Sequence, residues 1–332
     1  MKFQKMLLVV SMVIFFGVCY FIMNRYYDPL ARYPYATSEN RELIISSISK
    51  HDIQFIIDEN IRPEQFLSFV GVDGFNIKNT VAYYEISKLS SENAATIVSF
   101  VNQAMSKYSL EQLLELLKSY SFSNIIDWIN YGDVYAEGSN LVINPTANDV
   151  ILNRTNTVGR YQPSDLVRTD ALSTLISQGD FLLREEANDK LDEMCAAIEG
   201  VFSDKCGGLI ATQGYMSYEA QRAVYDRYLL EYGPSGIFDY FNYPGHNEFQ
   251  LGNTLTVLTA KTNESTFAQT AQYNWLKNNA YKYGFVFRYD YSKQDVESLI
   301  RRSNQLRYVG VELATTLHNE NIVLDELMKV NQ

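Results

Sequence analysis

The chain of 332 residues carries a net charge of −11, and 46% of its residues are hydrophobic. This length suits one large domain or two modest ones, and the composition is that of a folded protein with an apolar core. Phosphate binding needs clustered Lys and Arg, so the acidic balance argues against nucleic acid as a partner.

An apolar segment near the N-terminus predicts a membrane anchor. Residues 6–23 form an uncharged run that follows Lys2 and Lys5. A helix that spans a bilayer needs roughly 17 to 25 such residues, and basic residues before it favour a cytoplasmic N-terminus. We therefore expect a cytoplasmic tail at 1–5, one transmembrane helix at 6–23 in the cell membrane, and an extracellular remainder. A cleaved signal peptide is the alternative, although residues 24–27 offer no small-residue cleavage site.

The next region, residues 24–140, has a helical pattern. Apolar side chains recur there at helical spacing, as at Ile53, Ile56 and Ile57. A break before Pro63 suits the end of one helix and the start of another with proline in its first turn. Because apolar residues at this spacing usually form a core, we expect an extracellular helical region that acts as a spacer or a protein-binding module.

From residue 141 the pattern changes. Gly, Pro, Asn and Asp first interrupt short apolar stretches, and amphipathic helical segments then alternate with strand-like ones at 207–215, 253–260 and 285–290. This alternation predicts an α+β fold. We expect residues 141–332 to form a small antiparallel sheet packed with helices, preceded by the all-helical region and the transmembrane helix.

The three cysteines fall into two classes. Cys19 lies in the predicted anchor, whereas Cys195 and Cys206 lie in the predicted extracellular part, where a disulfide can persist. A disulfide would join a helix end to the next strand, and two buried thiols are the alternative. The spacing leaves both open, but without a nearby histidine it is not a zinc pattern.

Four ordered segments in the second half of the chain carry a more specific signal. They read QGYMSYEAQ at 213–221, NEFQLGNTLT at 247–256, WLKNNAYKYGF at 275–285 and RSNQLRYVG at 302–310. Together they resemble the VanY-type D-alanyl-D-alanine carboxypeptidases. The resemblance implies a peptidase-like fold from a family of zinc enzymes that trim the last D-alanine from bacterial wall peptides.

The chain departs from the family pattern where the metal and the chemistry would be. The family's zinc ligands correspond to Phe249, Thr256 and Gln305, its catalytic glutamate to Arg302 and its substrate-gripping arginine to Met216. A hydrolytic zinc site needs three ligands from His, Asp, Glu or Cys, and a carboxylate that takes a proton from water. Phenylalanine has no lone pair and arginine stays protonated. We therefore expect no cofactor, no metal and no catalytic residue in this chain.

An active enzyme is the alternative. It would need a rebuilt zinc site around His246, or an unusual or metal-free mechanism that uses Glu248 or Glu297 near Gln250. A lone histidine in a Pro-Gly-His turn is more often a hydrogen-bonding turn residue.

Binding is the predicted role. The residues expected to line a ligand pocket are Ser217, Gln221, Glu248, Gln250, Arg288 and Arg302. Arginine binds carboxylates through a bidentate fork, so Arg302 would turn the zinc pocket into an anion-binding pocket. The alternative is that Arg302 is a solvent-exposed arginine that balances the acidic surface. We predict a membrane-anchored, extracellular pseudo-carboxypeptidase that binds a peptidoglycan stem peptide or a cell-wall protein. A purely structural membrane protein is a further alternative.

Overall fold

The computed structural model describes most of the chain. The described residues are 2–25, 28–175, 180–237, 241–289 and 304–330. The chain divides into two compact units, Met1–Leu110 and Glu111–Gln332. The domain boundary near residue 141 stays a prediction.

The described part of the first unit consists of helices and turns. Its helices are α1 (Lys2–Arg25), α2 (Arg41–Ser47), α3 (Lys50–Asp58), α4 (Pro63–Phe66), the 3-10 helix η1 (Ile77–Asn79), α5 (Thr80–Ser87) and α6 (Ala94–Ala104); α7 (Leu110–Leu116) begins at the unit's last residue. The start of a helix at Pro63 is confirmed, since this proline occupies the first turn of α4. Ile44, Ile53, Ile56 and Phe66 are among the residues that build a small core between α2, α3 and α4.

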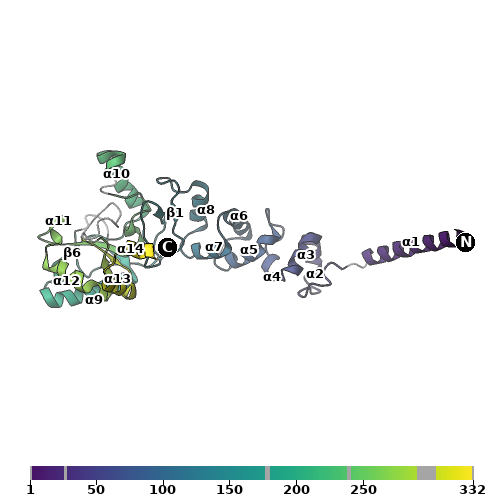
Figure 1. Cartoon of the computed structure of the whole chain (residues 1–332), viewed down its shortest axis with the longest axis horizontal. Helices are drawn as coiled ribbons and strands as arrows, with labels where there is room; N and C mark the ends of the chain where they lie inside the picture. Colours follow the sequence, from purple (N-terminus) through teal and green to yellow (C-terminus); the bar gives the residue numbers. More distant parts are fainter. Residues whose placement is uncertain (1, 26–27, 176–179, 238–240, 290–303, 331–332) are drawn as a thin grey trace. The chain divides into compact units, whose positions relative to one another are not determined.

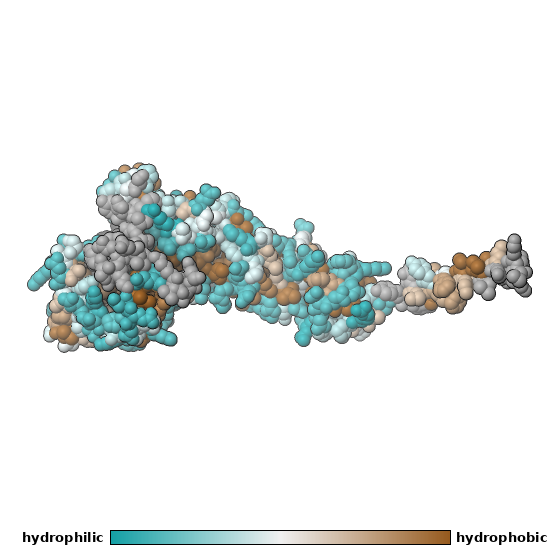
Figure 2. Space-filling model, viewed as in Figure 1, coloured by the Kyte–Doolittle hydropathy of each residue, from teal (hydrophilic) through white to brown (hydrophobic). Residues whose placement is uncertain are grey.

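Helix α1 covers the apolar N-terminal segment. Figure 2 shows brown and tan residues along this helix, and its large hydrophobic side chains that the structure describes are mostly exposed. Within the described ranges, no helix combines the length and apolarity that a bilayer crossing requires. The transmembrane helix expected at 6–23 is therefore not shown by the structure.

The second unit is α+β, as predicted, but its main sheet is mixed. Its strands follow the order β4 (Ser173–Thr174), β6 (Leu209–Gln213), β7 (Thr254–Thr259), β9 (Gln305–Tyr308) and β8 (Phe285–Phe287). The β4–β6 pair is parallel, and the other three pairs are antiparallel. The prediction of a simple antiparallel sheet is wrong because the short strand β4 runs alongside β6 in the same direction.

Two small ladders and several helices complete this unit. Strand β1 (Asn140–Leu141) pairs in parallel with β2 (Asn156–Thr157), and β3 (Leu166–Arg168) pairs antiparallel with β5 (Leu182–Arg184). The helices are α8 (Phe122–Tyr131), α9 (Glu185–Phe202), α10 (Tyr218–Gly236), α11 (Glu264–Phe267), α12 (Ala271–Asn279), α13 (Val311–Glu320) and α14 (Leu324–Val330), with 3-10 helices η2 (Lys205–Gly208), η4 (Glu248–Leu251) and η5 (Ala280–Tyr283).

The two faces of the main sheet differ in chemistry. Leu255 of β7 lies opposite Leu306 of β9, and both belong to the main core together with residues of α9 and α12. These two helices lie with β6 at one end of the unit (Figure 1). Successive side chains of a strand point to opposite faces, so Thr256 and Gln305, which are paired with each other, lie on the other face. That polar face carries the candidate site.

The structure joins Cys195 and Cys206 in a disulfide. Their Cα atoms are 4.1 Å apart, and both residues are buried in the main core. The bond links α9 to η2, directly before β6. Of the two alternatives that the spacing left open, the structure therefore contains the disulfide.

Candidate functional site

The three positions predicted to correspond to the family's zinc ligands lie on neighbouring elements of the second unit. Thr256 lies directly opposite Gln305 in the β7–β9 pair, and η4, which holds Phe249, packs against β7. All three side chains are buried, with exposed fractions of 3% to 4%. The fold thus places the three predicted positions on two paired strands and on a 3-10 helix that packs against one of them.

The side chains at these positions do not fit a zinc ion. The Thr256 hydroxyl is 2.7 Å from the Thr212 hydroxyl, which lies at a register shift in β6, and the two share a hydrogen bond. Phe249 offers an aromatic ring, and Gln305 offers a neutral amide. Zinc in proteins is held by His, Cys, Asp or Glu. Among the described residues, no cluster of three such side chains could hold a metal ion.

His246 is engaged elsewhere. It is 1% exposed, its Nε2 is 2.8 Å from the Asp133 carboxylate and its Nδ1 is 2.5 Å from the Asn153 carbonyl oxygen. Both ring nitrogens thus have a partner, so neither is left for a metal. This arrangement gives no support to a zinc site rebuilt around His246 and Glu248.

The Asp133–His246 pair is a feature that the sequence analysis missed. Asp133 also accepts hydrogen bonds from the backbone N–H groups of Tyr135 and Ala136, at 2.7 and 3.0 Å. Burial on its own would raise the pKa of Asp133, but the hydrogen bonds from His246 and from the backbone outweigh it and hold the pKa below its usual value. The pair is 113 residues apart in sequence, and no motif connects its members.

Glu248 and Arg288 form the centre of a buried ion cluster. The Arg288 Nε is 2.9 Å from both Glu248 oxygens, and the other end of its guanidinium binds Asp325. Arg307 Nη1 is 3.0 Å from Glu248, which makes an ion pair although the angle does not suit a hydrogen bond. Burial would lower the pKa of Arg288, but Glu248 raises it well above its ordinary value. Among the described residues, the cluster contains two carboxylates and two guanidiniums, whose charges balance. Its ion pairs join segments of the same chain.

Gln221 and Gln250 also bind other parts of the chain. The Gln221 amide donates to the Gln250 carbonyl at 3.0 Å, and Gln250 in turn donates to the backbone carbonyls of Gly159 and Tyr161, each at 2.8 Å. Gln221 accepts from the N–H of Gly245 at 3.0 Å. Both amides are fully buried. Through these hydrogen bonds, the two side chains connect the segment after β2 and the turn before η4 to helix α10.

The structure describes only one of the remaining two residues of the predicted ligand pocket, Ser217 and Arg302. Ser217 is the N-cap of α10, and its hydroxyl accepts a hydrogen bond from the N–H of Ala220 at 3.2 Å. Arg302 and Glu297 lie outside the described residues. Each described member of the predicted set thus has a partner within the chain, and ligand binding by this set stays a prediction.

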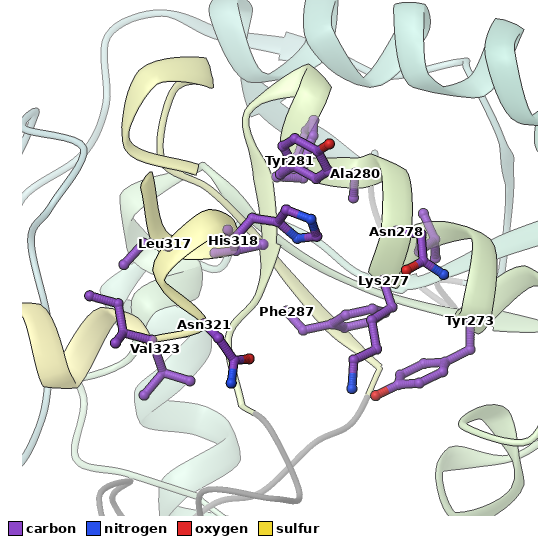
Figure 3. Close-up of a pocket in the computed structure, with 14 residues that line it drawn as sticks. Tyr273, Lys277, Asn278, Ala280, Tyr281, Phe287, Leu317, His318, Asn321 and Val323 are labelled. Atoms are coloured by element: carbon purple, nitrogen blue, oxygen red, sulfur yellow. The ribbon is translucent and has the colours of Figure 1, made fainter. Parts of the chain in front are cut away.

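A separate cavity of about 170 Å³ lies between α12, η5, β8 and α13 (Figure 3). Figure 3 shows Tyr281 next to His318, and their rings stack with centroids 3.8 Å apart. Lys277 and Tyr273 line another side of the same cavity. None of the residues predicted for the ligand pocket lines it.

Comparison with known proteins identifies the family. The family model VanY, D-alanyl-D-alanine carboxypeptidase, matches residues 180–311. The putative carboxypeptidase YodJ of Bacillus subtilis is 31% identical over 172 residues, which are 51% of this chain and 62% of that protein. A D-alanyl-D-alanine carboxypeptidase of Enterococcus faecalis is 28% identical over 132 residues, 37% of this chain and 48% of the relative. The chain thus spans between about half and three-fifths of the length of these curated relatives.

A solved structure of a carboxypeptidase supports the same family assignment. The structure of the LdcB LD-carboxypeptidase, which reveals the molecular basis of peptidoglycan recognition, superposes with a TM-score of 0.53 at 30% sequence identity. The match covers 58% of this chain and 91% of that one. The chain therefore belongs to the VanY D-alanyl-D-alanine carboxypeptidase family.

Proposed function

We propose that this chain is a non-catalytic member of the family that binds peptidoglycan stem peptides on the outer surface of a bacterial cell. One observation carries the proposal. The positions predicted to correspond to the family's three zinc ligands hold Phe249, Thr256 and Gln305. Thr256 and Gln305 lie opposite each other in paired strands, and the Thr256 hydroxyl is hydrogen-bonded to the Thr212 hydroxyl. Without a metal-bound water and a carboxylate base, the hydrolysis that this family carries out has neither its nucleophile nor its proton acceptor.

The parts that the chain retains support a binding role. Gly252, which keeps its place in the second motif, has a φ of +73°, and a Cβ there would lie 2.9 Å from Leu166 and 3.0 Å from Arg184. The buried hydrogen bonds that Gln250 and Glu248 form with other parts of the chain likewise stabilise the backbone around the predicted ligand positions. These contacts support a chain that has the family's scaffold but carries other residues at the predicted ligand positions. Because relatives bear the names D-alanyl-D-alanine carboxypeptidase and LD-carboxypeptidase, the ligand proposed is the peptide end of the wall precursor.

The proposed location is the outer face of the cell membrane. Its support is the uncharged apolar run at 6–23 behind Lys2 and Lys5, which suits an anchor with a cytoplasmic N-terminus. The disulfide between Cys195 and Cys206 suits the same side of the membrane, because disulfides persist in oxidising compartments.

The experiment measures metal, turnover and binding on one preparation of the full chain. After equilibration with zinc and removal of loosely bound metal, we expect far less than one zinc per chain. We also expect no release of alanine from a peptide that ends in D-Ala-D-Ala, and saturable binding of that peptide by calorimetry. About one tightly bound zinc per chain together with alanine release would make the protein an active peptidase. Absence of both turnover and peptide binding would leave the protein-partner alternative.

A further inference from the structure

A second cavity, of about 260 Å³, opens beside α8 in the second unit. One wall is a single flank of this helix, where Asn124, Asp127, Trp128 and Tyr131 recur at the spacing i, i+3, i+4 and i+7. Helix α8 lies before residues 180–311, which match the family model. Tyr218 on the facing wall lies within the matched residues, but none of the residues predicted for the zinc ligands or for the ligand pocket lines this cavity.

The facing wall carries Arg160 and Tyr218. The Arg160 guanidinium lies 4.5 Å from the centroid of the Tyr218 ring, and it forms an ion pair with Glu219. A guanidinium has five N–H donors, so one ion pair leaves several of them for a ligand. This wall thus offers hydrogen-bond donors next to an aromatic surface.

Aromatic surface runs from the inside of the cavity to its mouth. Trp128 is 8% exposed, whereas Tyr131, one helical turn further along, is 75% exposed. Aromatic rings supply a large flat apolar face with a polar atom at one edge. Such a face suits a flat or ring-shaped ligand that has an apolar side and a polar rim.

The charges of the lining decide the chemical class of the ligand. In the described part of the chain, the exposed Asp127 carboxylate has neither a hydrogen-bond nor an ion-pair partner, so it remains an acceptor for a ligand. The Asp133 carboxylate is already bonded to His246 and to backbone N–H groups. A cationic ligand would be repelled by Arg160, and an anionic ligand would be repelled by Asp127. A neutral ligand whose hydroxyl groups both donate and accept satisfies both walls.

We propose that this cavity binds one or two pyranose rings of a neutral glycan. The C–H face of a pyranose packs on an aromatic ring such as Trp128 or Tyr131, while its hydroxyl groups bond to Asp127 and Arg160. The volume is just below the range of about 300 to 1,000 Å³ typical of sites for drug-sized molecules, which suits one or two sugar rings. The inference goes beyond the proposed function, since a sugar contains neither the peptide nor the terminal carboxylate of a stem peptide.

The test follows tryptophan emission in the full chain. The protein contains two tryptophans, so Trp275→Phe leaves Trp128 as the single reporter. Tri-N-acetylchitotriose is titrated to about 10 mM, which would nearly saturate a site with a Kd of about 1 mM. We expect a saturable change in emission, because a sugar ring over the indole displaces water from it. If Trp275→Phe impairs folding, calorimetry on the unaltered chain provides the same titration.

Four variants assign the binding to the cavity. Asp127→Ala and Tyr131→Ala should each weaken binding by roughly tenfold or more, about 1.4 kcal/mol. Tyr131→Phe keeps the ring, so it should weaken binding less than Tyr131→Ala does. The control is Glu111→Ala, which removes an exposed carboxylate of α7 outside the cavity and should retain the parent Kd.

Three outcomes would overturn the proposal. The first is that the folded protein gives no saturable response to the sugar. The second is that Asp127→Ala and Tyr131→Ala leave sugar binding unchanged, and the third is that an amine such as choline binds more tightly than the sugar. The proposed function is judged with a D-Ala-D-Ala peptide that contains no sugar, so failure of one idea leaves the other standing.

Discussion

Thr256 lies directly opposite Gln305 in the antiparallel pair of β7 and β9, on the face of the sheet turned away from the main core. Side chains of directly opposed residues on one face have Cβ atoms roughly 4.5 to 5.5 Å apart. A carboxylate and an imidazole at these positions could therefore reach one metal ion. The backbone at these two positions therefore suits a metal centre, although the side chains present do not.

Restoring the donors should restore the metal site. We expect the triple variant Phe249→His, Thr256→Asp and Gln305→His to bind about one zinc per chain, because it then presents three ligands of the kinds that zinc prefers. Zinc content after dialysis and a calorimetric titration would measure this.

The matched control for the triple variant is the same chain with Thr256→Asn in place of Thr256→Asp. Asparagine has nearly the shape of aspartate but lacks its charge, so zinc affinity should fall markedly. A folded triple variant without zinc affinity would show that these three positions do not correspond to the family's ligands.

The Asp133–His246 pair should stabilise the fold. Leaving a buried hydrogen-bond donor without its partner typically costs about 1 to 3 kcal/mol. Asp133→Ala leaves His246 and two backbone N–H groups without theirs, so it is expected to lower the free energy of unfolding by roughly 3 kcal/mol, measured by urea denaturation. The control is Asp226→Ala, which removes a half-exposed carboxylate on α10 and should change stability by less than about 1 kcal/mol. Equal effects of the two changes would refute a stabilising role for the buried pair.

The same pair should contribute to stability in a pH-dependent way. The pKa of Asp133 is lower in the folded protein than its usual value, because hydrogen bonds from His246 and the backbone outweigh the effect of burial. The folded state therefore binds this proton less readily than the unfolded state. The contribution of Asp133 is complete above about pH 4, the usual pKa of an aspartate, and is lost as the pH falls through the lower folded value. Unfolding curves of the parent and of Asp133→Asn should converge toward acid pH, and a constant difference between them would contradict this assignment.

Some of this structure could be predicted from short-range patterns. The α+β class and the helix start at Pro63 followed from the periodicity of apolar residues and from proline geometry. Thr256 and Gln305 lie in adjacent strands, and their assignment as ligand positions of the family stays a prediction.

Features that depend on long-range contacts could not be predicted in this way. Strand β4 has two residues and no distinctive pattern, so its parallel pairing with β6 appears only in three dimensions. Asp133 and His246 meet because a segment outside the motifs folds onto the turn before η4. Arg288 was predicted to bind a ligand because the sequence alone does not show its partners. In the structure, Glu248 and Asp325 bind the two ends of its guanidinium.

Arg288 should be needed for folding rather than for ligand binding. Arg288→Met would leave the carboxylates of Glu248 and Asp325 without their main partner in a buried environment, and the free energy of unfolding should fall by about 3 to 5 kcal/mol. Arg288→Lys keeps the charge but cannot form the fork that binds two carboxylates, so it should recover only part of the loss.

The control for Arg288 is Arg222→Met, an exposed arginine of α10 whose i,i+4 partner is Asp226. Exposed pairs of this kind contribute roughly 0.3 to 0.5 kcal/mol. If Arg288→Met unfolded at the same urea concentration as Arg222→Met but lost affinity for a D-Ala-D-Ala peptide, Arg288 would be a ligand-binding residue.

The disulfide between Cys195 and Cys206 should stabilise the second unit by holding α9 to the segment that leads into β6. The bond closes a short loop, since the cysteines are 11 residues apart, and loops of about 15 residues contribute roughly 3 kcal/mol in the chain-entropy description. The double variant Cys195→Ala and Cys206→Ala is expected to unfold at a lower urea concentration than the oxidised parent. Comparison with the reduced parent separates the effect of the bond from that of the smaller side chains. If reduction left the unfolding midpoint of the parent unchanged, the bond would have no stabilising role, and the packing of the two buried residues in the core would account for any effect of the double variant.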